Sequence, residues 1–274
     1  MERRTVLASL GAMAMFGGTN LLAQQRPQST QSAREAHEAA MKAGPIRDIA
    51  MVMYPGFFVQ DMVGPYMTLA LLPRTRVHLI ARTKDTIYAT PGKFGIVPTG
   101  TFEDCPRDLD ILMVPGGAFS TVEALENEET VAFVRDRGSR AKWVTSVCTG
   151  SLILGAAGLL KGYKATSHWL THDLVERFGA IPTRGRVVVD RNRATGGGVT
   201  AGIDFGLRIA SILDGEHMAQ TIQLVAEYDP EPPFDAGSPD RAPKDVKEMV
   251  DEMYAPFMTA VTATVDKLAR GLKT

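Results

Sequence analysis

One cysteine at the end of an apolar run is the residue of this sequence best placed to do chemistry. Cys148 follows the run Trp143–Val147 and precedes the small residues Thr149-Gly150-Ser151, a pattern typical of a strand that turns into a helix. The unpaired N–H groups and the dipole at a helix N-terminus favour an anion, so the position predicts a stabilised thiolate and nucleophilic catalysis. Inert packing is the alternative, because cysteines are among the most buried residues.

Other candidate catalytic residues lie in two loops and directly after the cysteine. Asp61, at a predicted helix start, is either an acidic partner of the nucleophile or a helix cap. Gly116 and Gly117 follow Pro115, where backbone N–H groups can approach a developing oxyanion or the chain can make a tight turn. Thr149 adds a hydroxyl beside Cys148 that can bond a substrate atom or water.

Three further residues are expected to line a substrate pocket. They are His168, Phe57 and Val199. His168 is also a candidate base, although a lone histidine is more often structural. The glycines at 196–198 mark a close backbone approach at a helix entrance, but their spacing is not that of a dinucleotide or phosphate loop.

The composition is that of an ordinary globular protein and indicates a small-molecule substrate. The 274 residues, 45% apolar and 22% charged, are enough for one sizeable core. The 30 Lys plus Arg nearly balance the 31 Asp plus Glu, and a net charge of −1 gives no electrostatic basis for binding nucleic acid. With only Cys105 and Cys148, and no Cys/His cluster, we expect no metal, no cofactor and no disulfide framework.

The N-terminus predicts export. Arg3 and Arg4 precede the apolar run Val6–Phe16, which is short for a bilayer span and is typical of a twin-arginine signal peptide, here at residues 1–23. Residues 24–44 form a polar linker with a short helix around Ala33–Lys42. We expect a periplasmic or secreted protein with no stable membrane association once the signal is removed. An uncleaved anchor or a cytoplasmic location is the alternative.

Apolar runs alternate with helical patterns between residues 45 and 240. The predicted strands are 49–53, 77–81, 109–114, 143–147, 165–167 and 187–190, and the predicted helices are 62–72, 122–137, 149–160, 169–178, 201–213 and 216–227. This alternation predicts one α/β domain whose parallel sheet is covered on both faces. Ligands bind beyond the carboxyl ends of such strands, where the loops named above should meet. A proline-rich loop at 230–239 separates the domain from a C-terminal helix within 241–274.

Six segments resemble the ThiJ/PfpI superfamily, whose members are related to class I glutamine amidotransferases. They are QDMVGP at 60–65, PGG at 115–117, VTSVCTGS at 144–151, LGAAGLL at 154–160, TGGGVTAGIDF at 195–205 and PPFDAGSP at 232–239. The resemblance implies a flavodoxin-like three-layer sandwich with a nucleophile elbow, and a homodimer. It also implies Cys148 as nucleophile, Asp61 as its acidic partner and Thr149 as a supporting hydroxyl.

Two positions favour the branch of this superfamily that hydrates isocyanides. Many members have a glutamate in the first loop and a histidine after the cysteine, where this chain has Asp61 and Thr149. The reaction implied is addition of water to an isocyanide, giving an N-substituted formamide through a thioimidate on Cys148. A glyoxalase-like enzyme acting on methylglyoxal and a non-enzymatic redox or small-molecule sensor are the alternatives.

Overall fold

The chain divides into two units, residues 1–41 and 42–274, of which the computed structural model describes residues 32, 34–36, 38–39, 42 and 44–272. The described residues between 32 and 42 are helical, as predicted for the linker. The predicted signal peptide at 1–23 lies outside the described residues. Within the described part of the chain, no helix combines the length and the hydropathy of a membrane span.

The second unit is built on a seven-stranded sheet with the strand order β10-β11-β7-β6-β1-β2-β5. Its strands are β1 (Arg47–Val52), β2 (Thr75–Ala81), β5 (Gly100–Thr101), β6 (Ile111–Val114), β7 (Trp143–Val147), β10 (Val187–Asp190) and β11 (Arg193–Gly196). Neighbouring strands pair in parallel except β10 with β11. The strands β1, β6 and β7 are apolar and mostly buried, as a parallel sheet covered on both faces requires.

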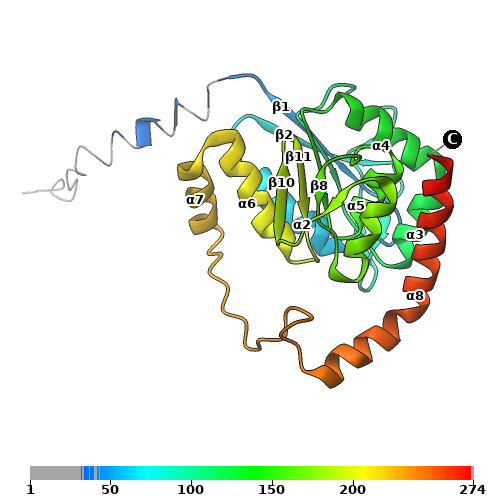
Figure 1. Ribbon diagram of the computed structural model, residues 1–274. Coiled ribbons are helices and arrows are strands. Elements are labelled where there is room, and N and C mark those ends of the chain that lie inside the picture. Colours follow the sequence, from blue (N-terminus) through cyan, green and yellow to red (C-terminus); the bar gives the residue numbers. More distant parts are fainter. Residues whose placement is uncertain (1–31, 33, 37, 40–41, 43, 273–274) are drawn as a thin grey trace, which may run out of the picture. The chain divides into compact units, whose positions relative to one another are not determined.

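Helices cover both faces of this sheet, which confirms the predicted flavodoxin-like three-layer sandwich (Figure 1). One layer holds α2 (Val59–Leu69), α6 (Ala201–Asp214) and α7 (Glu216–Val225). The other holds α3 (Phe119–Glu126), α4 (Glu128–Arg140), α5 (Gly150–Ala156), the 3-10 helix η1 (Trp169–Phe178) and α8 (Lys244–Gly271). Two small ladders lie outside the main sheet: β3 (Ile87–Ala89) with β4 (Phe94–Ile96), and β8 (Lys164–Ala165) with β9 (Ile181–Pro182).

Three sequence-based expectations are corrected by the structure. The helix predicted at 122–137 is two helices, because Asn127 ends α3 and caps α4, its Oδ1 accepting a 2.8 Å hydrogen bond from the Thr130 N–H. The helix predicted at 169–178 is a 3-10 helix. Strand β11 was not predicted, since Arg-Ala-Thr-Gly offers no apolar run, yet it pairs with β7 directly beside Cys148.

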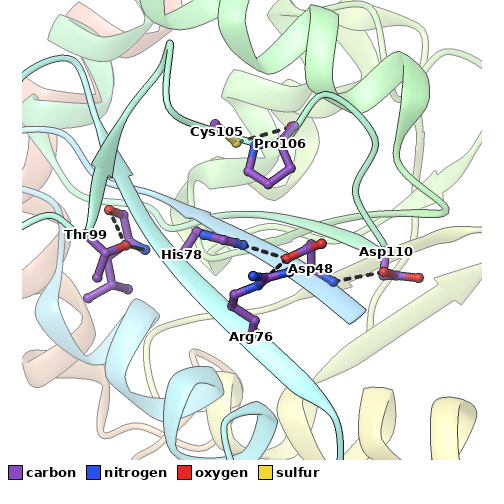
Figure 2. Close-up of polar contacts among 8 residues, drawn as sticks. Asp48, Arg76, His78, Thr99, Cys105, Pro106 and Asp110 are labelled. Atoms are coloured by element: carbon purple, nitrogen blue, oxygen red, sulfur yellow. Dashed lines mark hydrogen bonds and ion pairs between the residues drawn. The ribbon is translucent and has the colours of Figure 1, made fainter. Parts of the chain in front are cut away.

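The amino ends of β1, β2 and β6 are joined by polar contacts, at the sheet edge opposite the loops predicted to do chemistry. Asp48 Oδ1 accepts a 2.8 Å hydrogen bond from Arg76 Nε and lies 2.8 Å from His78 Nε2 (Figure 2). The backbone N–H of Asp48 donates to Asp110 Oδ2 at 2.9 Å (Figure 2). Burial alone would raise the pKa of Asp48, but its bonds to His78 and Arg76 hold that pKa below the ordinary value. These contacts stabilise the edge away from the site.

Candidate active site

Cys148 lies at a sharp turn between β7 and α5, as the sequence predicts. Its φ of 58° is in the left-handed region, which is strained for a residue with a side chain. Its N–H donates to the carbonyls of Gly196 (3.1 Å) and Gly197 (2.8 Å). Its carbonyl accepts hydrogen bonds of 3.1 Å from the hydroxyls of Ser151 and Ser167. These four contacts hold the elbow in its strained conformation.

Asp61 is brought to the elbow by the first turn of α2 and is fully buried. It does not cap the helix, because Phe58 is the N-cap residue and makes no side-chain cap bond. Asp61 Oδ2 accepts a 2.8 Å hydrogen bond from the Gly116 N–H. Its Oδ1 is buried without a well-formed hydrogen bond among the described residues, while the Cys148 thiol interacts with the same carboxyl group. The structure therefore brings together the two residues expected to carry the reaction.

Burial is the largest influence on the pKa values of Asp61 and Cys148. It raises the pKa of Asp61 to about 7, although the hydrogen bond from Gly116 opposes the rise. Burial, together with the nearby Asp61 charge, raises the pKa of Cys148 well above its ordinary value. The N–H groups of Thr149 and Val199 face the sulfur and favour the thiolate, but they are outweighed. The raised pKa favours a resting thiol at Cys148 over the stabilised thiolate expected from the helix N-terminus.

The two glycines of the Pro115-Gly116-Gly117 turn use their N–H groups inside the protein. Gly116 donates to Asp61, and the Gly117 N–H donates to Thr149 Oγ1 at 2.8 Å. The Thr149 hydroxyl in turn donates to the Gly117 carbonyl at 2.7 Å. The donors expected for an oxyanion, and the hydroxyl expected for a substrate, therefore hold the turn instead. A Cβ on Gly116 would lie 2.5 Å from the Thr149 nitrogen, so this close approach requires glycine.

The predicted pocket residues have three different roles. Phe57 is fully buried with its ring centroid 6.1 Å from that of Tyr54, so it belongs to the core and not to a pocket wall. His168 Nδ1 accepts a 3.3 Å hydrogen bond from the Leu170 N–H at the start of η1, and burial lowers the pKa of His168 to about 4. It is neutral at pH 7 and structural. Val199 places its N–H against the Cys148 sulfur.

Two cavities of about 260 and 350 Å³ share the residues Pro55, Ser120 and Glu123 in their walls. Neither Cys148 nor Asp61 belongs to either wall. Cys148 is buried, with 3% of the residue exposed. Among the described residues there is also no group of three or more side chains suited to bind a metal ion.

Comparison with known proteins identifies the family. A model of the DJ-1/PfpI family matches residues 47–212, from β1 into α6, a range that contains Asp61, Gly116 and Cys148. The chain belongs to the DJ-1/PfpI family. A relative named isonitrile hydratase, from Pseudomonas putida, is 47% identical over 224 residues, which are 82% of this chain and 97% of the relative.

Two further similar proteins extend this comparison. The crystal structure of a ThiJ/PfpI family protein from Pseudomonas syringae matches with a TM-score of 0.80 and 46% identity, covering 92% of this chain and 98% of that one. The HTH-type transcriptional regulator GbdR of Pseudomonas aeruginosa is 28% identical over 156 residues, 56% of this chain but 41% of the regulator. The superfamily inferred from the sequence is confirmed.

Sequence reasoning missed two residues of this DJ-1/PfpI site. The Thr121 hydroxyl lies 2.7 Å from Thr149 Oγ1 and 3.0 Å from the Gly117 carbonyl oxygen, within hydrogen-bond distance of both. The Tyr54 hydroxyl donates to the Pro115 carbonyl at 2.8 Å. Tyr54 could have been found as the first residue of the aromatic loop after β1. No pattern marks Thr121, a helical residue whose role appears only when α3 is placed against the elbow.

Proposed function

We propose that this chain hydrates isocyanides to N-substituted formamides, with Cys148 as nucleophile and Asp61 as proton carrier. The observation that carries the proposal is the buried Cys148–Asp61 pair, in which the carboxyl group has a pKa of about 7. A group with that pKa gives up and takes back protons equally well near neutral pH. The 47% identity to isonitrile hydratase supports the choice of substrate class.

The shape of an isocyanide also fits this site. Its reacting carbon is the end of a linear, uncharged C≡N group, only one atom wide. Such an end needs less room than a bulkier carbonyl group to approach Cys148, a residue that is 3% exposed. Because an isocyanide is uncharged, it also needs no counter-ion beside Cys148.

In the first half of the reaction the thiol becomes covalently bound to substrate. Asp61 takes the proton of Cys148, and the thiolate forms a C–S bond to the terminal carbon of the isocyanide. Protonated Asp61 then gives the proton to that carbon, leaving a thioimidate, R–N=CH–S–Cys148, and a carboxylate. Covalent catalysis thereby divides one difficult addition into two easier steps.

In the second half Asp61 activates water. The carboxylate takes a proton from water as the hydroxide adds to the thioimidate carbon, and it passes this proton to the nitrogen. Asp61 then removes the hydroxyl proton as the tetrahedral adduct collapses, the C–S bond breaks and the formamide leaves. Return of that proton to the sulfur restores the starting pair, so the net change is addition of one water.

The test is an assay of purified protein with an alkyl isocyanide, in which formamide is quantified by mass spectrometry. We expect turnover by the wild type and its loss in Cys148→Ser. Cys105→Ser is the matched control, because Cys105 is the other buried cysteine and the charged groups that act on it are Arg137 and Asp48, not Asp61. Formamide production that survives in Cys148→Ser, or is absent from the wild type, overturns the proposal.

The same preparation separates the alternatives. Lactate formed from methylglyoxal would favour the glyoxalase-like activity over isocyanide hydration. Oxidation of Cys148 by dilute peroxide, in a protein that turns over neither substrate, would favour the sensor.

A further inference from the structure

Three hydroxyl groups form a connected chain behind the catalytic pair. The Thr121 Oγ1 atom lies 2.7 Å from Thr149 Oγ1, and Thr121 also interacts with the Tyr54 hydroxyl. Thr121 is fully buried, and Thr149 and Tyr54 are 2% and 5% exposed. Buried polar groups of this kind are costly unless each is bonded, so the cluster is expected to have a single arrangement.

All three hydroxyls bond to one short segment, the turn at 115–117. Tyr54 donates to the Pro115 carbonyl at 2.8 Å, and Thr149 donates to the Gly117 carbonyl at 2.7 Å. The Thr121 hydroxyl lies 3.0 Å from the same Gly117 oxygen, so its proton is shared between that oxygen and Thr149 Oγ1. The residue between these two anchors is Gly116, whose N–H donates to Asp61 Oδ2 at 2.8 Å. The turn is therefore clamped on both sides of the one amide that touches the catalytic carboxyl group.

We propose that Thr121 and Tyr54 are positioning residues for the reaction at Cys148, because their hydroxyls hold the 115–117 turn so that the Gly116 N–H stays on Asp61. Neither side chain needs to touch the substrate. The catalytic consequence rests on the proposed function, whereas the effect on the reactivity of Cys148 does not.

The consequence of loosening the turn has a defined sign. The Gly116 hydrogen bond favours the carboxylate and lowers the pKa of Asp61. A weaker bond lets this pKa rise, so Asp61 keeps its proton to higher pH. Less negative charge then stands beside the sulfur, and the Cys148 thiolate forms more readily, since the Asp61 charge raises the pKa of Cys148. Besides Cys148, Tyr54 is the titratable group that feels the Asp61 charge, and its own pKa is raised far above neutrality by burial.

Two pH profiles should accordingly move in opposite directions in Thr121→Val, which keeps the shape but loses the hydroxyl. The rate of Cys148 alkylation by iodoacetamide, followed by mass spectrometry, should begin to rise at lower pH, by roughly 0.5 to 1 unit. The acid limb of kcat for isocyanide hydration should move to higher pH, because water activation needs ionised Asp61. At pH 7 we expect kcat to fall about 10-fold with KM changed less than about 2-fold.

Matched variants distinguish loss of the positioning hydroxyl from loss of the folded structure. Thr121→Ser restores the hydroxyl and should return both profiles to those of the wild type, and Thr259→Val removes a hydroxyl from the exposed surface of α8 and should change neither. If Thr121→Val does not fold, Tyr54→Phe, which removes one oxygen atom from the same clamp, is measured in its place. Each of these two variants that folds should lose activity while its circular dichroism spectrum stays that of the wild type.

Two results overturn the inference. One is an alkylation profile in Thr121→Val and Tyr54→Phe that coincides with that of the wild type. The other is a Thr121→Ser variant as impaired as Thr121→Val, because this would implicate the methyl packing instead of the hydroxyl. If the wild type hydrates no isocyanide, the proposed function fails, and the alkylation profiles alone still decide this inference.

Discussion

Asp61 is a carboxyl group kept away from water, and its burial costs the folded protein stability. In the unfolded chain its pKa is about 3.9, and in the structure burial raises the pKa to about 7. Between these values the folded state holds a proton that the unfolded state has lost, so the contribution of Asp61 to stability falls as pH rises from about 4 to 7. The role proposed for Asp61 thus comes at a cost in stability.

Asp61→Asn should remove that penalty. The amide oxygen can still accept the Gly116 hydrogen bond, but the side chain no longer ionises. We expect the variant to be more stable than the wild type by about 2 to 4 kcal/mol at pH 8 and by much less at pH 5. Urea denaturation at the two pH values measures this. A stability difference that does not grow between pH 5 and pH 8 would show that the Asp61 pKa is not raised.

The proximity of Cys148 and Asp61 could be predicted from the sequence, but the hydrogen bonds of their neighbours could not. Cys148 and Asp61 follow strands whose carboxyl ends must meet at one edge of the sheet, so residue type and order are enough. The bonds made by Gly116, Gly117 and Thr149 depend on the direction of single N–H and hydroxyl groups. These directions follow from backbone dihedrals, which no sequence pattern specifies.

The backbone of the elbow is strained, because Cys148 has a φ of 58°, and hydrogen bonds from neighbouring residues must hold it in place. Ser151 Oγ lies 2.6 Å from the Thr166 carbonyl oxygen and 3.1 Å from the Cys148 carbonyl oxygen, and its single proton is shared between the two. We expect Ser151→Ala to lower the free energy of unfolding by about 1 to 2 kcal/mol and to slow alkylation of Cys148. Ser139→Ala, which loses an exposed hydrogen bond in α4, is the control and should have little effect. Equal effects of the two substitutions would refute a special role for Ser151.

The contact between α2 and α6 positions Asp61 from the other side of the site. A Cβ on Gly206 of α6 would lie 1.8 Å from Thr68 Oγ1 and 2.9 Å from Thr68 Cβ in α2. Gly206→Ala should therefore push α2 away, with a loss of about 1 to 3 kcal/mol in stability and reduced turnover. Denaturation and the formamide assay measure these effects together. Gly237→Ala is the control, because a Cβ there meets nothing within 4 Å, and it should leave stability and turnover unchanged. If Gly206→Ala also leaves turnover unchanged, the helices can separate without moving Asp61.

The elements themselves could be predicted where their apolar pattern is strong. Strands β7 and β10 have the bounds predicted for them, and α8 occupies the range with helical spacing. Strand β11 could not be found, because its stability comes from pairing between β7 and β10 and not from its own four residues. The break at Asn127 was missed because the helical spacing runs on through the capping residue.

At the scale of the whole molecule, export and homodimer formation stay predictions. N-terminal sequencing of the mature protein tests the first, since the signal lies outside the described residues. Light scattering tests the second. The N-terminal half of α8 exposes Val246, Met249 and Met253.

Packing of α8 on α3 links the C-terminal end of the chain to the site. Phe257 of α8 is 3% exposed, and its ring centroid lies 5.8 Å from that of Phe119, the first residue of α3. The same helix carries Thr121, two residues further on. If α8 were lost, one wall would be removed from the helix that clamps the 115–117 turn.

Phe257→Ala should consequently affect the site as well as the stability of α8. The cavity left by the ring should cost about 3 to 5 kcal/mol, whereas Phe234→Ala, at a side chain 79% exposed, should cost less than about 0.5 kcal/mol. Hydrogen exchange followed by mass spectrometry should show protection lost in α3 together with α8, because the two helices share this contact. If protection is lost only in α8, and protection of α3 and turnover are unchanged, then α8 does not support the candidate active site.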